Sequence, residues 1–224
     1  SNYNRVANNT ASGNYIGTYM YEVKCCDIAG NRLADNVYGL FSVNLFNMTV
    51  VDNEVTSNDL DGMRFEVASN LTVAGNRATA NGRAGISLTS SKNCTVSGNA
   101  GMANFDGIYA ESYSNLTVQG NNVTQNSRSG VALQSSDDNL VAGNNASGHD
   151  ELMYTGSGIR VIQSDRNNVS GNVVDDSVNG IFAYKSDNNT FASNKARRNV
   201  QAGGMYLGYS DWNEISNNEI VSNW

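Results

Sequence analysis

The feature that most limits the fold of this chain is a short phrase that recurs at intervals of 22 or 23 residues. It reads NLTVAGN at Asn70–Asn76, NCTVSGN at Asn93–Asn99 and NLTVQGN at Asn115–Asn121. A period of this length is typical of solenoids, in which each repeat stacks on its neighbours. The repeat therefore predicts a stacked arrangement of similar units along the whole chain.

The period extends over the chain when each unit is started at the glycine that precedes an apolar-x-apolar triplet. These glycines are Gly17, Gly39, Gly62, Gly85, Gly107, Gly130, Gly158, Gly180 and Gly203. An asparagine stands fourteen residues after each of them, from Asn31 to Asn217. A second column, nineteen residues after the glycine, is asparagine except at His149, Ser177 and Ser222. Asparagine accounts for 36 of the 224 residues, and much of this excess lies in the two columns.

Each unit contains short runs of alternating apolar and polar residues, such as GISLTS at Gly85–Ser90, which is the pattern of a half-buried β-strand. One unit cannot bury its apolar side alone, whereas stacked units bury Ile86 and Leu88 against their equivalents in adjacent coils. Asparagine tolerates the left-handed conformation at a bend, and its amide can bond the same amide about 4.8 Å away in the next coil. The sequence predicts an all-β parallel β-helix of about ten coils with asparagine ladders.

We expect one β-helix domain, residues 1–224, truncated at both ends because the chain starts and stops inside a repeat. One unit is 28 residues long, which predicts a longer loop at 145–157. His149, the only histidine, lies in this loop and also on the second asparagine column. It is either a functional loop residue, with Asp150 and Glu151 beside it, or a ladder residue. The ladder interpretation is favoured, since these three residues lack the spacing of a metal site.

The stretch GISLTSSKNCTVSGNAGMAN at Gly85–Asn104 resembles the repeat of right-handed parallel β-helix proteins, and the resemblance covers essentially the whole chain. That superfamily is described as carbohydrate-binding proteins and sugar hydrolases. It includes NosD-like periplasmic proteins, alginate epimerases, pectin-degrading enzymes and microbial surface proteins. The resemblance implies the fold strongly and the function weakly. The Tyr-Gly-(Phe/Ile)-Asp-Pro-His-Asp motif of alginate epimerases is absent from this proline-free chain, as are the Gly-His-Gly and Arg-Ile-Lys motifs of polygalacturonases.

The charge and the lengths of the apolar runs argue against two kinds of partner, nucleic acid and the interior of a membrane. The net charge of -7 provides no basic surface for phosphates, so we expect no nucleic acid as partner. No run approaches eighteen apolar residues, so we expect no membrane insertion of this fragment. A polysaccharide or surface glycan is the expected partner, at an extracellular, cell-surface or periplasmic location. We expect a monomer, with end-to-end association of uncapped coils as an alternative.

The outer surface of the strand that follows each starting glycine can be predicted, because alternation points the second and fourth residues after the glycine outward. Small Ser87 and Thr89 lie between bulky neighbours, which predicts a depression in this surface. The residues that we expect around it are Arg64, Glu66, Tyr109 and Glu111 as walls, with Asp61, Asp106 and Arg83 near the rim. Aromatic rings can stack on sugar faces, and carboxylates and arginine can bind hydroxyl or uronate groups. The alternative is a solvated strand surface without a ligand.

Three functions remain open. The first, which we favour, is a scaffold that binds carbohydrate or a partner through Arg64, Glu66, Arg83, Tyr109 and Glu111, with no metal and no cofactor. The second is a glycoside hydrolase or lyase. Its candidate catalytic residues are Glu66, Glu111, Asp61, Asp106 and Arg64, and calcium would enter only for a lyase. The third is a structural spacer or adhesin stalk.

Other reactive residues fit structural roles better. Cys26 and Cys94 fall on one inward column three coils apart, about 14 Å, which is beyond disulfide reach. Together with Cys25 they are expected to act as small packing residues rather than as nucleophiles. The acidic pairs Asp137–Asp138 and Asp175–Asp176 fall at turns, where such residues are ordinary.

Overall fold

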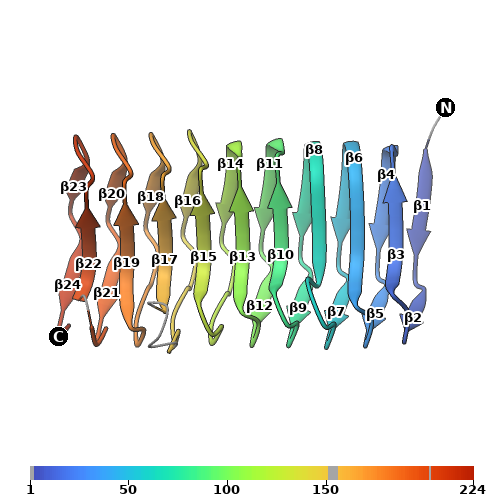
Figure 1. The fold of residues 1–224 in the computed structure, drawn as a ribbon, viewed down its shortest axis with the longest axis horizontal. Coiled ribbons are helices and arrows are strands. Elements are labelled where there is room, and N and C mark those ends of the chain that lie inside the picture. Colours follow the sequence, from blue (N-terminus) through green and yellow to red (C-terminus); the bar gives the residue numbers. More distant parts are fainter. Residues whose placement is uncertain (1–2, 151–155, 202) are drawn as a thin grey trace.

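The computed structural model describes residues 3–150, 156–201 and 203–224, which form a β-solenoid whose coils stack in sequence order along the long axis (Figure 1). The solenoid makes about nine turns, one fewer than expected. All strand pairings between coils are parallel. The fold class predicted from the period is confirmed.

Each complete coil contributes to three faces. The first face contains β3 (Ile16–Tyr21), the N-terminal part of β6 (Tyr38–Val51) and of β8 (Met63–Ala74), β10 (Ala84–Thr89), β13 (Asp106–Glu111), β15 (Ser129–Gln134), β17 (Ser157–Ile162), β19 (Asn179–Tyr184) and β22 (Gly203–Gly208).

The second face follows directly along the chain. It contains β1 (Asn4–Ala7), β4 (Lys24–Ala29), the C-terminal part of β6 and of β8, β11 (Lys92–Ser97), β14 (Ser114–Gln119), β16 (Leu140–Ala142), β18 (Asn168–Ser170), β20 (Thr190–Ala192) and β23 (Glu214–Ser216). The third face contains β2 (Thr10–Ser12), β5 (Arg32–Ala34), β7 (Glu54–Thr56), β9 (Arg77–Thr79), β12 (Ala100–Met102), β21 (Lys195–Arg197) and β24 (Glu219–Val221).

The core is a set of aliphatic columns, one residue per coil. On the first face Ile86 pairs with Met63 on one side and Ile108 on the other, and all three are fully buried. Val73, Val96 and Val118 form the equivalent buried column on the second face. A single strand could not exclude water from these side chains, so the stacking of coils is what stabilises each of them.

Both asparagine columns are ladders of hydrogen bonds between coils. Asn76 donates its backbone N–H and its side-chain amide to Oδ1 of Asn99, at 2.9 and 3.0 Å. In the second column Asn81 makes the same two bonds to Asn104, at 2.9 and 3.0 Å. These side chains are almost completely buried, so each amide satisfies a backbone group that water cannot reach.

The last described coil differs from the sequence-based alignment. Gly180 is followed in register by Gly204 rather than Gly203, because Asn179 pairs with Gly203. The ladders therefore end at Asn218 and Asn223, which accept the backbone N–H groups of Asn194 and Asn199, and not at Asn217 and Ser222. The prediction was wrong here because it started the unit at the first of two adjacent glycines, although only Gly204 directly precedes an apolar-x-apolar triplet, Met205-Tyr206-Leu207.

Two further ladders were not predicted. One contains Asn139, Asn167, Asn189 and Asn213, and the other contains Ser136, Ser164, Ser186 and Ser210. Each covers only part of the chain, so neither appears as a column in every unit. They order the turn between the first and second faces in the C-terminal half of the solenoid.

The extra residues of the long unit lie after His149. Ala146 and His149 still bond the next coil, through Val173 O and Ser177 Oγ. His149 and Ser157 are eight residues apart, whereas their equivalents Asn126 and Ser129 are three apart. The predicted loop at 145–157 is thus limited to the segment between His149 and Ser157, of which residues 151–155, including Glu151, lie outside the described residues.

Candidate functional site

The outward residues of the first face lie where alternation predicts. Met63, Phe65 and Ile108 are fully buried, whereas the side chains of Arg64 and Glu66 keep 22% and 29% of their surface exposed. Thr89 pairs with Glu66 in the preceding coil and with Glu111 in the following one. The two glutamates are therefore two coils apart with a small residue between them.

A cavity of about 140 Å³ lies on this face, at the start of β10 and β13. Its walls are formed by Asp61, Arg83, Ala84, Ser87, Phe105, Asp106, Tyr109 and Arg128. The expected depression beside Ser87 is therefore present, but it extends toward the turns that precede the strands. Asp61 and Asp106 are part of its wall, whereas Arg64, Glu66 and Glu111 do not line it.

Arg64 holds two of the candidate carboxylates. Its Nη1 lies 3.2 Å from Asp61 Oδ2, and its Nη2 lies 2.6 Å from Glu66 Oε1. Asp61 also accepts the backbone N–H of Ala84 at 3.0 Å. Burial alone would lower the pKa of Arg64, but the hydrogen bond to Glu66 and the charge of Asp61 outweigh it, so this pKa is raised. Arg64 therefore remains a cation that orders the carboxylates beside the cavity.

Arg128 and Phe105 are cavity residues that the sequence interpretation missed. Arg128 forms a two-point ion pair with Asp106, whose side chain is only 4% exposed. The same guanidinium lies 4.6 Å from the ring centre of Phe105 and 5.8 Å from that of Tyr109. In this part of the cavity wall two rings and a buried carboxylate thus pack around one cation.

The missed residues belong to a column that lies before the strands. Arg83, Phe105 and Arg128 each stand two residues before a coil glycine, and backbone bonds connect Phe105 N to Arg83 O and Arg128 N to Phe105 O, at 2.8 and 2.7 Å. The sequence interpretation followed the residues after the glycine through all units, but before the glycine it named only Asp61, Arg83 and Asp106. A comparison of the residues two places before it would have found this column.

Burial controls the protonation of the cavity wall. Burial raises the pKa of Asp106, against the opposing effect of Arg128. Burial also raises the pKa of Tyr109 to about 12, and the nearby negative charge of Glu111 adds to this shift. Tyr109 therefore keeps its proton at neutral pH and can donate a hydrogen bond to a ligand.

The acidic pairs at turns are ion-paired with arginines of the next coil. Arg197 bonds Asp175 and Arg198 bonds Asp176, each at 2.7 Å. Arg166 bonds Asp137 at 3.2 Å, and it also bonds the neighbouring Asp138. These contacts are consistent with the structural interpretation of both acidic pairs.

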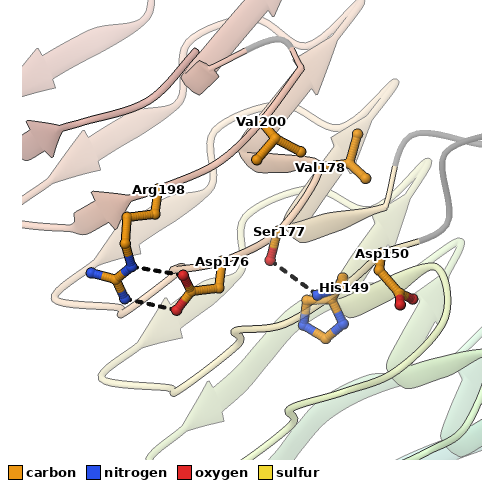
Figure 2. A pocket seen from close by; sticks show the side chains of 7 residues that line it. All are labelled: His149, Asp150, Asp176, Ser177, Val178, Arg198 and Val200. Carbon is orange, nitrogen blue, oxygen red and sulfur yellow. Dashed lines mark hydrogen bonds and ion pairs between the residues drawn. The ribbon is translucent and has the colours of Figure 1, made fainter.

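His149 occupies the second asparagine ladder. It is fully buried, its Nδ1 lies 2.9 Å from Asn126 O, and its backbone N–H donates to Ser177 Oγ at 3.2 Å. Burial lowers its pKa to about 4. Figure 2 shows it at the base of an open pocket of about 430 Å³, beside the Asp176–Arg198 ion pair and two valine side chains. The histidine acts as a ladder residue there.

The three cysteines are free thiols. Cys26 and Cys94 are buried, and they lie on one inward column with Met48 and Leu71 between them, as expected. Cys25 is exposed and adopts φ of 51° at a corner of the coil. Burial raises the pKa of Cys94, which keeps its thiol protonated.

Two protein-family models match the chain. The model described as periplasmic copper-binding protein (NosD) matches residues 1–156, and the model described as right-handed β-helix region matches residues 92–224. A search among curated proteins found no match.

Several solved structures have a similar fold. A crystal structure of a mutant of the periplasmic alginate epimerase AlgG superposes with a TM-score of 0.78 at 19% identity, covering 89% of this chain and 50% of that one. The A-module of mannuronan C-5 epimerase AlgE4 from Azotobacter vinelandii gives 0.71 at 17% identity, covering 90% and 62%. The Dettilon tailspike protein gives 0.68 at 12% identity, covering 96% and 55%.

The chain spans between half and two thirds of the length of these structures. At these identities the similarity concerns the fold. None of the described elements is a helix long and apolar enough to cross a lipid bilayer.

Proposed function

This chain belongs to the right-handed β-helix proteins matched by the NosD model, and on that premise we propose that it is a scaffold that binds carbohydrate along its first face. The proposed location is periplasmic or extracellular, and the descriptions of that family and of the epimerase AlgG, which both say periplasmic, support the first of these. The observation that carries the proposal is the cavity at the start of β10 and β13, which combines aromatic rings with paired charges.

The residues of the cavity can serve the different parts of a sugar. Tyr109 and Phe105 offer ring surfaces that match the apolar faces of a pyranose. Asp61 and Asp106 offer carboxylate oxygens to hydroxyl groups, and their arginine partners hold these oxygens in place. Arg83 forms no ion pair with any described residue, so its guanidinium can bind a ligand oxygen directly.

The cavity changes the roles expected for the predicted ligand residues, which were Arg64, Glu66, Arg83, Tyr109 and Glu111. Arg83 and Tyr109 would contact the sugar in the cavity. Arg64 would act by fixing Asp61 and Glu66, while Glu111 would contact a sugar unit bound beside the cavity. Phe105 and Arg128, supplied by the structure, complete the proposed set.

The structural neighbours agree with a carbohydrate ligand at the level of chemical class. Two of them are named as epimerases of alginate or mannuronan, and a third is a phage tailspike. The epimerase motif with its proline and histidine is absent here, so the neighbours support a sugar ligand without supporting epimerisation.

Copper, which the description of the NosD model names, does not fit the described residues. In the parts of the chain that the structure describes, no three His, Cys, Asp or Glu side chains converge as ligands. The single histidine has its Nδ1 within hydrogen-bonding distance of a backbone carbonyl, and Cys94 is buried in the core. We therefore base no step of the proposed function on copper.

Cleavage of a polysaccharide is the second candidate, and one observation favours it. Asp106 is a buried carboxyl with a raised pKa in the cavity wall, which is a property of general acids. Asp61 and Glu66, the other acidic candidates nearby, are both ion-paired to Arg64. We favour binding over cleavage, and a lyase with calcium remains a variant of the second candidate.

A glycan array followed by product assays separates the candidates. A binder retains one class of glycan and releases no product. An enzyme generates new reducing ends or unsaturated products, with calcium added in a parallel sample for the lyase. A spacer neither retains nor cleaves any glycan, and that outcome would reject the proposal.

A further inference from the structure

Arg160 lies on the first face beside the candidate site. In β17 it pairs with Ala132, which in turn pairs with Tyr109, so that the arginine and the tyrosine are two coils apart. At about 4.8 Å per coil, their backbones are about 10 Å apart. Ala132 is only 2% exposed, although it is an outward residue of this face with a small side chain. The neighbouring long side chains therefore cover it.

The Arg160 guanidinium lacks the ion-pair partner that Arg64 and Arg128 possess. Arg64 is paired with Asp61 and Glu66, and Arg128 is paired with Asp106. No described carboxylate lies within ion-pair distance of Arg160, and its Nε is buried without a hydrogen-bond acceptor. A buried donor without an acceptor is unfavourable, and more so when it is charged, so this atom favours a ligand that supplies an acceptor.

The nearby charges do not compensate Arg160. Burial lowers its pKa, and the positive charge of Arg128 lowers it further, while Asp106 and Tyr109 act in the opposite direction. Asp106 is already engaged by Arg128. Among the described residues, Asp106 is therefore the ion-pair partner of Arg128, and the positive charge of Arg160 is in excess on this half-buried surface of an otherwise acidic protein.

We infer that the surface over Ala132, between Arg128 and Arg160, binds an oxyanion carried by a sugar, either a carboxylate or a sulfate group. Such a group would accept hydrogen bonds from Arg160 and neutralise the excess charge. The inference rests on the proposed function, since it specifies the ligand that the cavity beside Tyr109 would hold.

A hydroxyl group alone would satisfy the site less well. A hydroxyl oxygen can accept a hydrogen bond from Arg160 Nε, but it carries no negative charge to offset the Arg160 guanidinium. Charge-assisted bonds between a guanidinium and an oxyanion are about twice as strong as neutral ones and are frequently two-pronged. The preferred ligand therefore has an acidic substituent close to a sugar unit that occupies the cavity.

The test uses the full chain and three oligosaccharides of equal length, which are neutral, carboxylated and sulfated. Titration calorimetry is performed on the unmodified protein, on Arg160→Gln and on Arg77→Gln. Arg77 is an exposed arginine of the third face, so its replacement changes the net charge equally without touching the site. Arg160→Lys is a third variant, which keeps the charge and loses the planar fork.

We expect the unmodified protein and Arg77→Gln to bind one acidic oligosaccharide about tenfold more tightly than the neutral one. Arg160→Gln should lose this preference and keep its affinity for the neutral ligand, and Arg160→Lys should be intermediate. The carboxylated and sulfated ligands identify which oxyanion is preferred. Melting temperatures of all variants show whether each is folded.

The outcomes separate the inference from the proposed function. Equal affinity for neutral and acidic ligands, unchanged in Arg160→Gln, would overturn the inference and leave carbohydrate binding intact. A similar loss of preference in Arg77→Gln would also overturn it, because it would assign the preference to net charge. Absence of binding to all three ligands would overturn both.

Discussion

Asn99 and Asn121 are joined by two hydrogen bonds through one oxygen: Oδ1 of Asn121 accepts both the backbone N–H and the side-chain amide of Asn99, at 2.9 and 3.0 Å. Both residues are buried, so no water can replace these bonds. The fold therefore depends on an amide at this position in each coil, and not merely on a residue of suitable size.

Replacement Asn99→Leu should lower the free energy of unfolding by about 1–3 kcal/mol, because the N–H of Asn76 and Oδ1 of Asn121 lose buried partners. Urea unfolding measures the loss. Asn122→Leu is the matched control, since Asn122 is exposed in the equivalent turn of the next coil and should change stability by less than about 0.5 kcal/mol. Equal stability of both variants would contradict the structural role of the ladder.

The repeated glycine is required by close approach of the backbone. A Cβ on Gly107 would lie 2.6 Å from Gly130 O and 2.7 Å from Val123 Cβ. Gly107→Ala should therefore destabilise the protein by about 1–3 kcal/mol, as measured by urea unfolding. In Gly101→Ala the nearest atoms would be 3.3 Å away, so the loss should be smaller. A greater loss at Gly101 than at Gly107 would reject this explanation.

His149 should make stability depend on pH. Its pKa is lowered to about 4 in the folded chain, against an ordinary value of about 6.5, so the unfolded chain binds the proton first as the pH falls. The contribution of neutral His149 to the free energy of unfolding is fully present above about pH 6.5. It is lost progressively as the pH falls toward 4, and the loss amounts to up to about 3 kcal/mol.

Urea unfolding at pH 7.5 and pH 4.5 checks this contribution. His149→Asn, which supplies an amide at the ladder position, should lose less stability between the two pH values than the unmodified protein. The carboxylates titrate in both proteins, so the difference between them isolates the histidine. Identical losses would show that His149 keeps an ordinary pKa.

Tyr109→Ala should weaken binding of a short oligosaccharide by about 1 kcal/mol or slightly more, because the ring surface in the cavity is lost. Calorimetry with a ligand selected from the array measures the change. Phe46→Ala removes an exposed ring from the second face and serves as control. A similar loss in both variants would place the ligand elsewhere or indicate binding without a defined site.

The period predicted the fold because each coil repeats the same apolar and amide positions, so Ile86 and Asn99 identify their partners without structural information. The end of the series was misplaced by one residue, since the unit was started at Gly203, whereas Gly204 directly precedes the apolar-x-apolar triplet and the pairing of Asn179 with Gly203 confirms that register. Where every unit agrees, sequence is sufficient; where one unit is longer, the hydrogen bonds decide.

The candidate site was predicted only in part. Tyr109, Asp61 and Asp106 were found because alternation and neighbouring columns place them around Ser87. Arg128 and Phe105 were missed because they reach the cavity from the turn before the strand, and no periodic rule gives the direction of a long side chain. The pairing of Arg64 with Glu66, two residues away on one strand, likewise depends on side-chain conformation.

The most direct measurement is a crystal structure of the protein with the best ligand from the glycan array. The account predicts a sugar unit in the cavity of the first face, with its ring against Tyr109 and oxygens bonded by Arg83 and Asp106. Well-defined sugar density on the second or third face, with the cavity at Tyr109 free of ligand, would contradict it.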